Sequence, residues 1–420
     1  MAVIVKKSLI FRILFALCIG VPYLSNYELT FAIWSFTAFV TLNKSYSFTF
    51  LKYATCFLVI LVIAIVVTDY GNVNSFFLVR DFTYLLKPVI GLFLGYQICR
   101  YTYENAFKTI IYIGCGIALI HLTIILITFL SFFHISVALI RIYAGYFSDY
   151  EVYALIILLF YKKFEIDFSR KQFWILTAII GTSAFLYLAR TNFIQFFILY
   201  IGLKGYFIIN RKSIIAISSI AALTLISYVI ILSINPKRNG DGIEEFLYKI
   251  KIAPTEPFKT KIDLDDYKDF NDNYRSVELI LTLKQTANKS RNEIFFGQGL
   301  GSQVDLKKNV FLGDMSMRFI SVLHNCFMTT LLKSGIVGIL ILLYSIFLIY
   351  NQKGSPIPIV HQINLLLMGT GVFLLVSNWV LMGYYFTQDS KSILVGFLIA
   401  YREITHKNQT KLPSETHPID

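Results

Sequence analysis

Charged residues are scarce in this chain of 420 residues: Asp, Glu, Lys and Arg make up 15% of it, whereas 56% is hydrophobic. A soluble globular protein carries about 25% charged residues, so this composition excludes an ordinary soluble fold. Apolar runs of about twenty residues recur along the chain, and each can cross a bilayer core of about 30 Å as a helix. The sequence therefore predicts an all-α polytopic membrane protein.

Motifs for metal, nucleotide and nucleic-acid chemistry are also missing. The five cysteines form no C-x-x-C pair and the histidines lack metal-ligand spacing, which predicts passive packing cysteines, no metal site and no cofactor. No Lys-Ser/Thr follows Gly297, Gly299 and Gly301 and no strand precedes them, which excludes a P-loop or dinucleotide fingerprint. The D-x-D at Asp263 and Asp265 lies among lysines, as is typical of a solvated surface. No basic-aromatic module predicts binding of nucleic acid.

The apolar runs predict about twelve membrane helices, or ten or eleven, because three of the runs are short. They fall at 9–24, 29–43, 48–68, 82–99, 107–131, 143–161, 172–189, 191–209, 213–234, 325–349, 359–386 and 391–402. The first run follows Lys6 and Lys7, and no small-x-small cleavage site comes after it. We therefore predict a retained helix and not a signal peptide.

Basic residues in the short loops predict the orientation in the membrane. With the N-terminus inside, they gather on the inner side at Lys6, Lys7, Arg12, Lys44, Lys52, Arg100, Lys108, Lys162, Lys163, Arg170, Lys171, Arg211, Lys212, Lys353, Arg402, Lys407 and Lys411. The outer turns, such as Asp69–Ser75, are nearly free of them. Both termini are therefore predicted to be cytoplasmic.

One long polar segment interrupts the helices and is predicted to face outward. The expected division is helices over 1–235, a large loop over 236–324, helices over 325–403 and a polar, loose tail over 404–420. The loop holds 14 basic and 13 acidic residues, so the net charge of +13 lies almost wholly outside it. Asn235–Asn273 predicts an irregular cap, whereas apolar spacing over Tyr274–Asn288 predicts an amphipathic helix on the membrane surface.

Four basic or titratable residues fall on the predicted outer side: Arg141, Arg190, Arg275 and His324. Basic residues on the outer side oppose the positive-inside tendency of membrane proteins, so each of them needs a structural or functional explanation. A guanidinium stays charged and can hold phosphate oxygens bidentately, which makes the arginines candidates for binding an anionic head group. The alternatives are a snorkelling Arg190, a structural Arg141 and a solvated surface Arg275.

His324 is the candidate base, because a neutral imidazole accepts a proton near physiological pH. A structural histidine at a helix start is the alternative. Asn325 either caps the following helix or holds the second imidazole nitrogen, and the sequence leaves both open. Gly299 and Gly301 are predicted to allow a compact turn or a close backbone approach at the membrane surface.

In this order the features resemble the O-antigen ligase and O-antigen polymerase family of bacterial envelope glycosyltransferases. The resemblance covers about Arg141 to Gly338 and the multi-helix frame. The matching pieces are RIYAGYF with Arg141 and Gly145, LARTN with Arg190, NYRSVELILTLK with Arg275, GQGLGS, and HNCFMTTLLKSGIVG with His324, Asn325, Gly335 and Gly338. We expect the last glycine pair to favour close helix packing. The chain departs from the family at Asp149–Glu151, where an asparagine or Pro-Asn is frequent, and it lacks an aromatic residue soon after Arg275.

The resemblance implies a GT-C-like frame in the bacterial inner membrane and a metal-independent glycosyl transfer at its periplasmic face. The donor would be a glycan on undecaprenyl diphosphate. The acceptor would be another lipid-linked repeat unit in a polymerase, or lipid A-core in a ligase, and a chain-length regulator is a further implied partner. We favour the polymerase, because this aromatic-rich, Lys- and Ile-rich sequence is typical of a variable locus.

The resemblance also implies roles for the candidate residues. Arg190 and Arg275, with Arg141, would stabilise the diphosphate as it leaves, and His324 would take the proton of the acceptor hydroxyl. Substrate contacts would come from Arg141, Asn325, Gly299 and Gly301.

A transporter or flippase of lipid-linked sugars is the alternative from another class. It predicts internal repeats and charged residues deep in the membrane. The sequence has no repeat, and the few ionisable residues noted in the apolar runs, Arg80, Asp81 and Lys87, lie near an expected helix start. A purely structural scaffold would leave the outward-facing arginines without a reason. Glycosyl transfer is therefore the favoured prediction.

Overall fold

The structure is a computed structural model that describes residues 2–132, 137–208, 210–238, 243–256, 259–263, 265–312 and 315–410. Its N-terminal helical elements are α1 (Ala2–Gly20), η1 (Val21–Leu24), α2 (Tyr27–Val40), α3 (Phe48–Val66), α4 (Ser75–Thr102), η2 (Tyr103–Asn105), α5 (Ala106–Phe132), α6 (Val137–Ala144), α7 (Asp149–Leu159), η3 (Tyr161–Phe164), α8 (Arg170–Leu186), α9 (Arg190–Leu203) and α10 (Arg211–Ile234). The remaining elements are α11 (Ile243–Ile252), α12 (Tyr267–Asp272), α13 (Tyr274–Ala287), α14 (Arg291–Phe296), β1 (Val304–Leu312), β2 (Met315–Ile320), α15 (Cys326–Tyr350), α16 (Pro358–Val380), η5 (Gly383–Tyr385) and α17 (Lys391–Thr410).

Five helical stretches of the described chain are long and apolar enough to cross a membrane. They are Phe48–Val66, Ser75–Phe132, Arg211–Ile234, Cys326–Tyr350 and Pro358–Val380. In α10, large apolar side chains such as Ile214, Leu223 and Val229 are exposed, and no residue of its most apolar window is buried. A helix whose apolar side chains are exposed along its length, with few protein contacts beyond those to α11, needs lipid around it. The chain is an all-α membrane protein with one small β-hairpin.

Helices occur at most of the predicted runs; α5 covers the run expected at 107–131, whereas α1, α4, α9, α16 and α17 each differ from the expected run by several residues at one or both ends. The run at 143–161 is an exception, because it is divided between α6 and α7. Gly145 follows α6 with φ +102°, a backbone conformation that favours glycine, and Ser148 caps the N-terminus of α7. The sequence was therefore wrong in predicting one continuous helix there, because apolar periodicity does not register a single glycine turn.

The polar segment has more structure than the sequence predicts. Its expected helix is confirmed as α13, but the apolar side of α13 packs against the hairpin and α15 in place of a membrane surface. Val277 lies in this small core with Val304 of β1 and Leu332 of α15. The predicted irregular cap contains α11 and α12, and the antiparallel pair β1–β2 was not predicted. The tail expected to be loose continues α17 as far as Thr410, and residues 411–420 lie outside the described chain.

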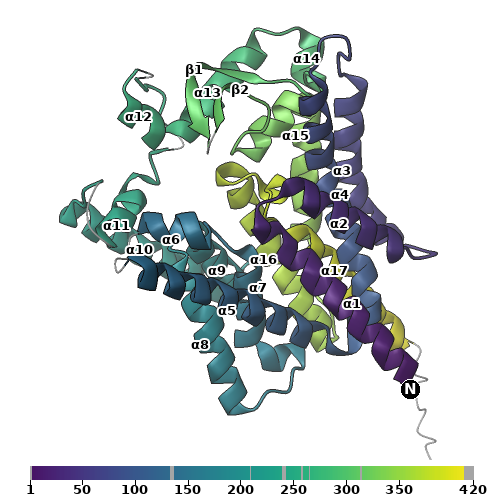
Figure 1. Cartoon of the computed structure of the whole chain (residues 1–420). Helices are drawn as coiled ribbons and strands as arrows, with labels where there is room; N and C mark the ends of the chain where they lie inside the picture. The colour runs from purple at the N-terminus through teal and green to yellow at the C-terminus, as the bar shows by residue number, and fades with distance from the viewer. Residues whose placement is uncertain are drawn as a thin grey trace, which may run out of the picture.

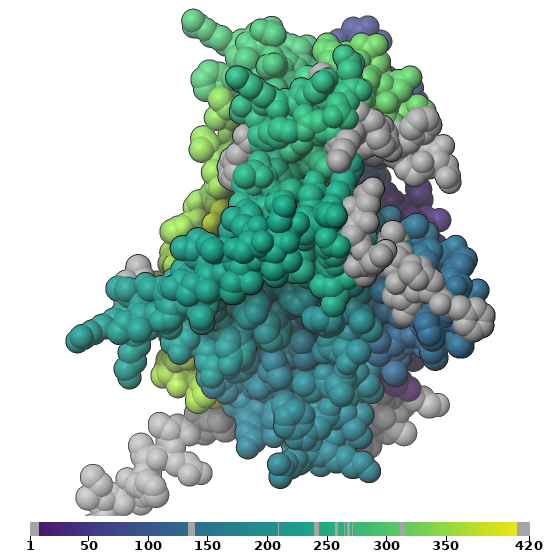
Figure 2. Space-filling view, turned by 90° about the vertical axis from the view of Figure 1, so that its left-hand side faces the viewer, coloured from purple at the N-terminus to yellow at the C-terminus, as the bar shows by residue number. Residues whose placement is uncertain are grey.

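The elements from α12 to β2 lie at one end of the chain's helices, and α11 lies lower, beside α10 and α6 (Figure 1); we call the surface that they form together the loop face. In Figure 1 the hairpin, α13 and α14 lie at the top, against the ends of α3, α4 and α15, and the N-terminus lies at the opposite end. Figure 2 shows the teal α10–α11 region between the blue helices below it and the green α12–β2 region above it. The loop face therefore brings residues from both halves of the chain together. All five cysteines are buried and unpaired.

Candidate functional site

Helix α13 positions two of the polar groups at the loop face. Val277 and Ser276 are buried beneath it, and this packing fixes the helix against β1 and α15. Arg275 and Glu278 are three residues apart, so they lie on neighbouring positions of one helical surface. Arg275 is directed to a carboxylate of the preceding segment, and Glu278 is directed to His324 at the start of α15.

The side chain of Glu278 holds His324 through two contacts. One carboxylate oxygen accepts a hydrogen bond from the His324 backbone N–H at 2.9 Å, and the other lies 3.0 Å from the imidazole Nδ1. The Glu278 side chain is 1% exposed, whereas that of His324 is 45% exposed. Because a carboxylate can only accept, Nδ1 carries the hydrogen, and the lone pair of the neutral ring is on Nε2. This arrangement orients a base toward open space.

Tyr274 forms a third side of the histidine site. Its ring meets the His324 ring edge to face, with ring centroids 5.5 Å apart and an interplanar angle of 89°. Burial, and then the negative charge of Glu278, raise the pKa of Tyr274 well above its ordinary value. Tyr274 therefore remains a neutral phenol that restricts the imidazole and offers no competing charge.

The structure decides the role of Asn325 between the two that the sequence left open. Its side-chain oxygen accepts a hydrogen bond from the backbone N–H of Met328 at 3.2 Å, which caps α15. The residue is buried, and Glu278 takes the imidazole contact instead. Helix capping therefore explains the position of the Asn325 side chain. A contact between this side chain and the substrate stays a prediction.

Two of the predicted arginines meet at one carboxylate, although they are far apart in the sequence. Glu256 lies 3.3 Å from the guanidinium of Arg190 at the start of α9, and 3.1 Å from that of Arg275 on α13. Arg190 also donates to the backbone carbonyl of Lys249 at 2.5 Å. The arginine side chains are 25% and 29% exposed, so both guanidinium groups reach solvent beside the shared carboxylate.

The third arginine, Arg141, lies close to this pair but has a different direct partner. Its guanidinium donates to the carbonyl of Leu188 at 2.9 Å. Arg141 lies near enough to Lys249 and Arg190 to share their electrostatic surroundings. Burial lowers the pKa of Lys249 most, and the positive charges of Arg141 and Arg190 lower it further. We call Arg141, Arg190, Lys249 and Arg275 the cationic cluster. Glu245 and Glu256 partly balance its charge.

The glycines of GQGLGS serve the packing of the loop face. Gly299 and Gly301 have φ of +81° and +76°, and an added Cβ would lie 2.6 Å from the Thr68 backbone or 2.3 Å from the Val73 side chain. The turn between them is pinned by Leu300 N–H, which donates to Thr68, and by Gly301 N–H, which donates to Asp81. Both glycines thus dock the loop onto the α3–α4 connection. A substrate contact by either one stays a prediction.

The second glycine pair, Gly335 and Gly338, lies in α15. Gly335 has φ +66° inside α15 and breaks its helical geometry, with the carbonyl of Phe295 close to where a Cβ would stand. Gly338 faces Ser334 and Thr330 of its own helix. Gly335 therefore makes a kink in α15 and lets the end of α14 approach its backbone closely, which agrees with the close helix packing expected at this glycine.

Sequence reasoning missed both glutamates of the site. Glu278 had a detectable signal, because it falls among the apolar residues on the buried side of an amphipathic helix, where a charge needs a partner. Glu256 had no such signal in the sequence, because it lies in a segment of mixed charge that is typical of a solvated loop. Within the described residues, no group of three or more His, Cys, Asp or Glu side chains is arranged to hold a metal ion.

Several ionisable side chains are buried in the first turns of helices or just before one, and they pair inside the fold. Lys333 of α15 and Asp81 of α4 pair at 2.5 Å, each 1% exposed. Lys391 of α17 pairs with Asp149 at 2.8 Å and with Asp389 at 2.5 Å, all of them buried. The sequence concealed the Asp81–Lys333 and Asp149–Lys391 pairs because the two partners lie in separate helices that are far apart along the chain.

The fold and these contacts define a polytopic all-α membrane protein with a histidine–glutamate pair and a cationic cluster on its loop face. Comparison with known proteins finds no family model that matches the chain and no curated protein that matches its sequence.

Proposed function

We propose that this protein is a polysaccharide repeat-unit polymerase of the bacterial inner membrane. It transfers a glycan from undecaprenyl diphosphate to a hydroxyl of another lipid-linked repeat unit at the periplasmic face. The proposal includes a GT-C-like frame of about twelve membrane helices, with both termini in the cytoplasm. The resemblance of the sequence motifs suggests this reaction, and the geometry of the loop face supports it.

One observation carries the proposal: α13 joins an oriented base to a pair of arginines. Its Arg275 meets Arg190 at Glu256, and its Glu278 orients His324 with Nε2 toward open space. A glycosyl transfer that expels a diphosphate requires both kinds of group, a cationic region for the leaving anion and a base for the acceptor hydroxyl. Two arginines without a base, or a base without the arginines, would not suit this reaction.

The proposed step forms one bond and breaks one. The acceptor oxygen attacks the anomeric carbon of the donor's reducing-end sugar, while the bond from that carbon to the diphosphate oxygen breaks. The acceptor proton passes to Nε2 of His324, and Glu278 stabilises the resulting imidazolium. Arg190 and Arg275 receive the negative charge that develops on the leaving lipid diphosphate, since a guanidinium offers five N–H donors.

Two further functions stay in competition with the polymerase. A ligase would use the same groups and differ in its acceptor, lipid A-core. The buried pairs Asp81–Lys333 and Asp149–Lys391 favour a transporter of lipid-linked sugars, because charges within membrane helices are frequent in transport pathways. However, each of these charges is paired inside the fold, and neither pair belongs to the cationic cluster or the histidine site.

The test is the glycan made by a strain that lacks this protein. A single repeat unit on lipid A-core indicates the polymerase, whereas long glycan retained on undecaprenyl diphosphate indicates the ligase. A flippase predicts that lipid-linked units accumulate on the cytoplasmic side, where an impermeant periplasmic label cannot reach them.

Arginine variants test the proposed site in the same strain. Arg190→Ala and Arg275→Ala should each fail to restore the glycan at wild-type protein levels. Arg318→Ala, which removes an exposed arginine of the hairpin, is the matched control and should restore it. Equal restoration by all three variants would remove the cationic cluster from the mechanism.

A further inference from the structure

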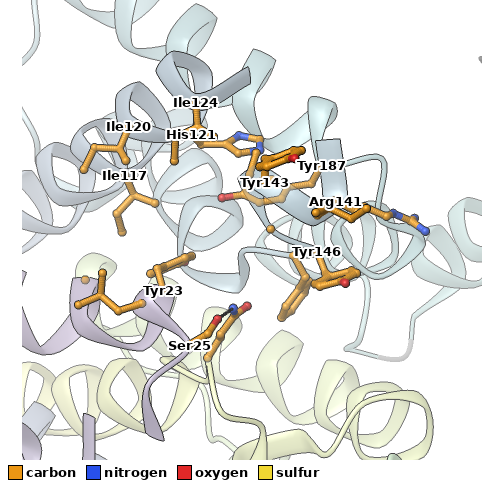
Figure 3. Close-up of a pocket in the computed structure, with 17 residues that line it drawn as sticks. Tyr23, Ser25, Ile117, Ile120, His121, Ile124, Arg141, Tyr143, Tyr146 and Tyr187 are labelled. Carbon is orange, nitrogen blue, oxygen red and sulfur yellow. Dashed lines mark hydrogen bonds between the residues drawn. The ribbon is translucent and has the colours of Figure 1, made fainter. Parts of the chain in front are cut away.

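A cavity of about 320 Å³ lies between α1–η1, α5 and α6, away from His324 and its partners. Figure 3 shows isoleucines of α5 along one side and tyrosines around the other, with Ser25 at the edge. Arg141 belongs to the wall, but its guanidinium group points away from the centre of the cavity (Figure 3). The interior is therefore lined by apolar and neutral polar groups.

This cavity continues into a second hollow of about 470 Å³, because Gly20, Ile117 and Ile120 line both. The second hollow runs along α5 as far as Thr109, between α5 and α1. From Thr109 to Ile124 the axial rise of the helix is about 22 Å, more than half of a bilayer core of about 30 Å. Together the two hollows form one groove, long enough for the hydrocarbon chain of a lipid from one leaflet.

Two glycines keep the groove open. An added Cβ at Gly20 or Gly116 would meet no atom within 4 Å, so neither glycine is required for helix packing. Gly116 lies one turn from both Tyr112 and Ile120, on the side of α5 that faces the groove. Empty space beside two small residues on facing helices leaves room for a slender chain.

His121 places a buried hydrogen-bond acceptor in the wall of the groove. The Nδ1 of His121 lies 2.8 Å from the hydroxyl of Ser183, which donates to Glu151 at 2.5 Å. Because the serine proton goes to Glu151, Nδ1 donates and Nε2 keeps its lone pair. His121 is 2% exposed, its ring stacks on Tyr187 at 3.7 Å, and Nε2 has no hydrogen-bond partner among the described residues.

We propose that the groove binds a single-chain lipid alcohol, whose hydroxyl donates to Nε2 of His121 and whose chain lies between α1 and α5. A buried acceptor without a donor is costly, and a hydroxyl supplies the missing hydrogen. An anionic head group has no hydrogen to offer Nε2, and the Arg141 guanidinium that would attract it points elsewhere. The site is separate from the histidine site and does not depend on the proposed function.

The test uses two photoreactive probes that differ only at the polar end, a diazirine-bearing hexadecanol and its methyl ether. The full-length protein is purified in detergent, labelled with each probe, and digested to locate the label. The alcohol should label peptides of α1 and α5 about two- to twelvefold more than the ether, because one neutral hydrogen bond contributes about 0.5–1.5 kcal/mol. Equal labelling by both probes, or label spread over all lipid-facing helices, would overturn the proposal.

Two variants separate the chain path from the acceptor. Gly116→Leu fills open space and should abolish labelling by both probes, whereas His121→Phe keeps a ring against Tyr187 and should remove only the preference for the alcohol. Leu126→Phe, at an exposed position of α5 outside the groove, is the matched control and should label as the wild type does. If His121→Phe does not fold, Gly116→Leu still tests the proposal, because undiminished labelling of the Gly116→Leu variant would show that the probes do not bind in the groove.

Discussion

His324 and His121 are each linked to a glutamate, but at different depths. His324 contacts Glu278 directly at 3.0 Å and leaves 45% of its side chain exposed, whereas His121 reaches Glu151 through Ser183 and is 2% exposed. The exposed ring can exchange protons with a bound hydroxyl or with water. The buried ring has a fixed hydrogen on one side and a dry lone pair on the other, which suits recognition and not proton transfer.

The ion pairs differ in the same way between the two depths. Asp305 and Arg318 pair on the hairpin with side chains 19% and 47% exposed, while Asp81 and Lys333 pair where each is 1% exposed. Water screens the first pair and not the second. Exposure therefore separates the polar groups that are available for chemistry from those that hold the helices together, and substitutions at both depths can test this separation.

The largest effect is expected at the exposed histidine. His324→Ala should lower glycan transfer by about 10²–10⁴-fold, the usual contribution of a general base, while the thermal unfolding midpoint changes little. Transfer is measured with purified protein and a lipid-linked repeat unit, as the length distribution of the products. His361→Ala removes a histidine of α16 and should keep full activity. Full transfer by His324→Ala would remove this residue from the mechanism.

The second effect concerns stability and is expected at the buried ion pair. Lys333→Met should destabilise the protein by about 3–5 kcal/mol, because Asp81 is left charged in a dry site. The measurement is thermal unfolding in detergent, followed by tryptophan fluorescence. The double variant Asp81→Asn with Lys333→Met should recover most of the loss, since no charge is then stranded. A single variant as stable as the wild type would contradict the structural role of this pair.

A smaller effect is expected where the glutamate orients the exposed histidine. Glu278→Gln removes the charge that stabilises the imidazolium and should lower transfer by about 10- to 100-fold, since a hydrogen bond to a charged group contributes about 1.5–3 kcal/mol. The matched control, Glu104→Gln, changes an exposed glutamate of η2. The loss should appear in kcat and not in KM, because substrate binding does not involve Glu278. A change in KM alone would indicate a binding role.

Much of the frame could be predicted from the sequence, because the apolar runs are strong local signals. The bounds of α5, α10 and α15 differ from the expected runs by three residues or fewer. The break at Gly145 and the hairpin were missed, since a single turn or a pair of polar strands gives little periodic signal. The arginines were found because they oppose the positive-inside pattern of a membrane protein, and His324 was found because an imidazole at a helix start can act as a base.

The partners of those residues could not be predicted, because they depend on packing between distant segments. Glu256 joins Arg190 to Arg275 only after α11 and α13 have folded over α9. The adjacent residues His324 and Asn325 do not act together as the sequence allowed. Asn325 caps α15, and Glu278 holds the imidazole of His324. A sequence shows which polar residues are unusual, and the fold decides which of them meet.

The smallest effect is expected at the exposed counterpart of the buried pair. The hydrogen bond from Arg318 is the main cause that lowers the pKa of Asp305 in the folded protein. The Asp305–Arg318 pair therefore contributes its full stabilisation above the pKa of Asp305 in the unfolded chain, which is about 3.9. This stabilisation is lost as the pH falls through the lower pKa of the folded state. Asp305→Asn should therefore cost at most about 1 kcal/mol at pH 7, and the difference from wild type should vanish in acid. Thermal unfolding at several pH values measures it. A cost as large as that of Lys333→Met would show that exposure does not separate the two pairs.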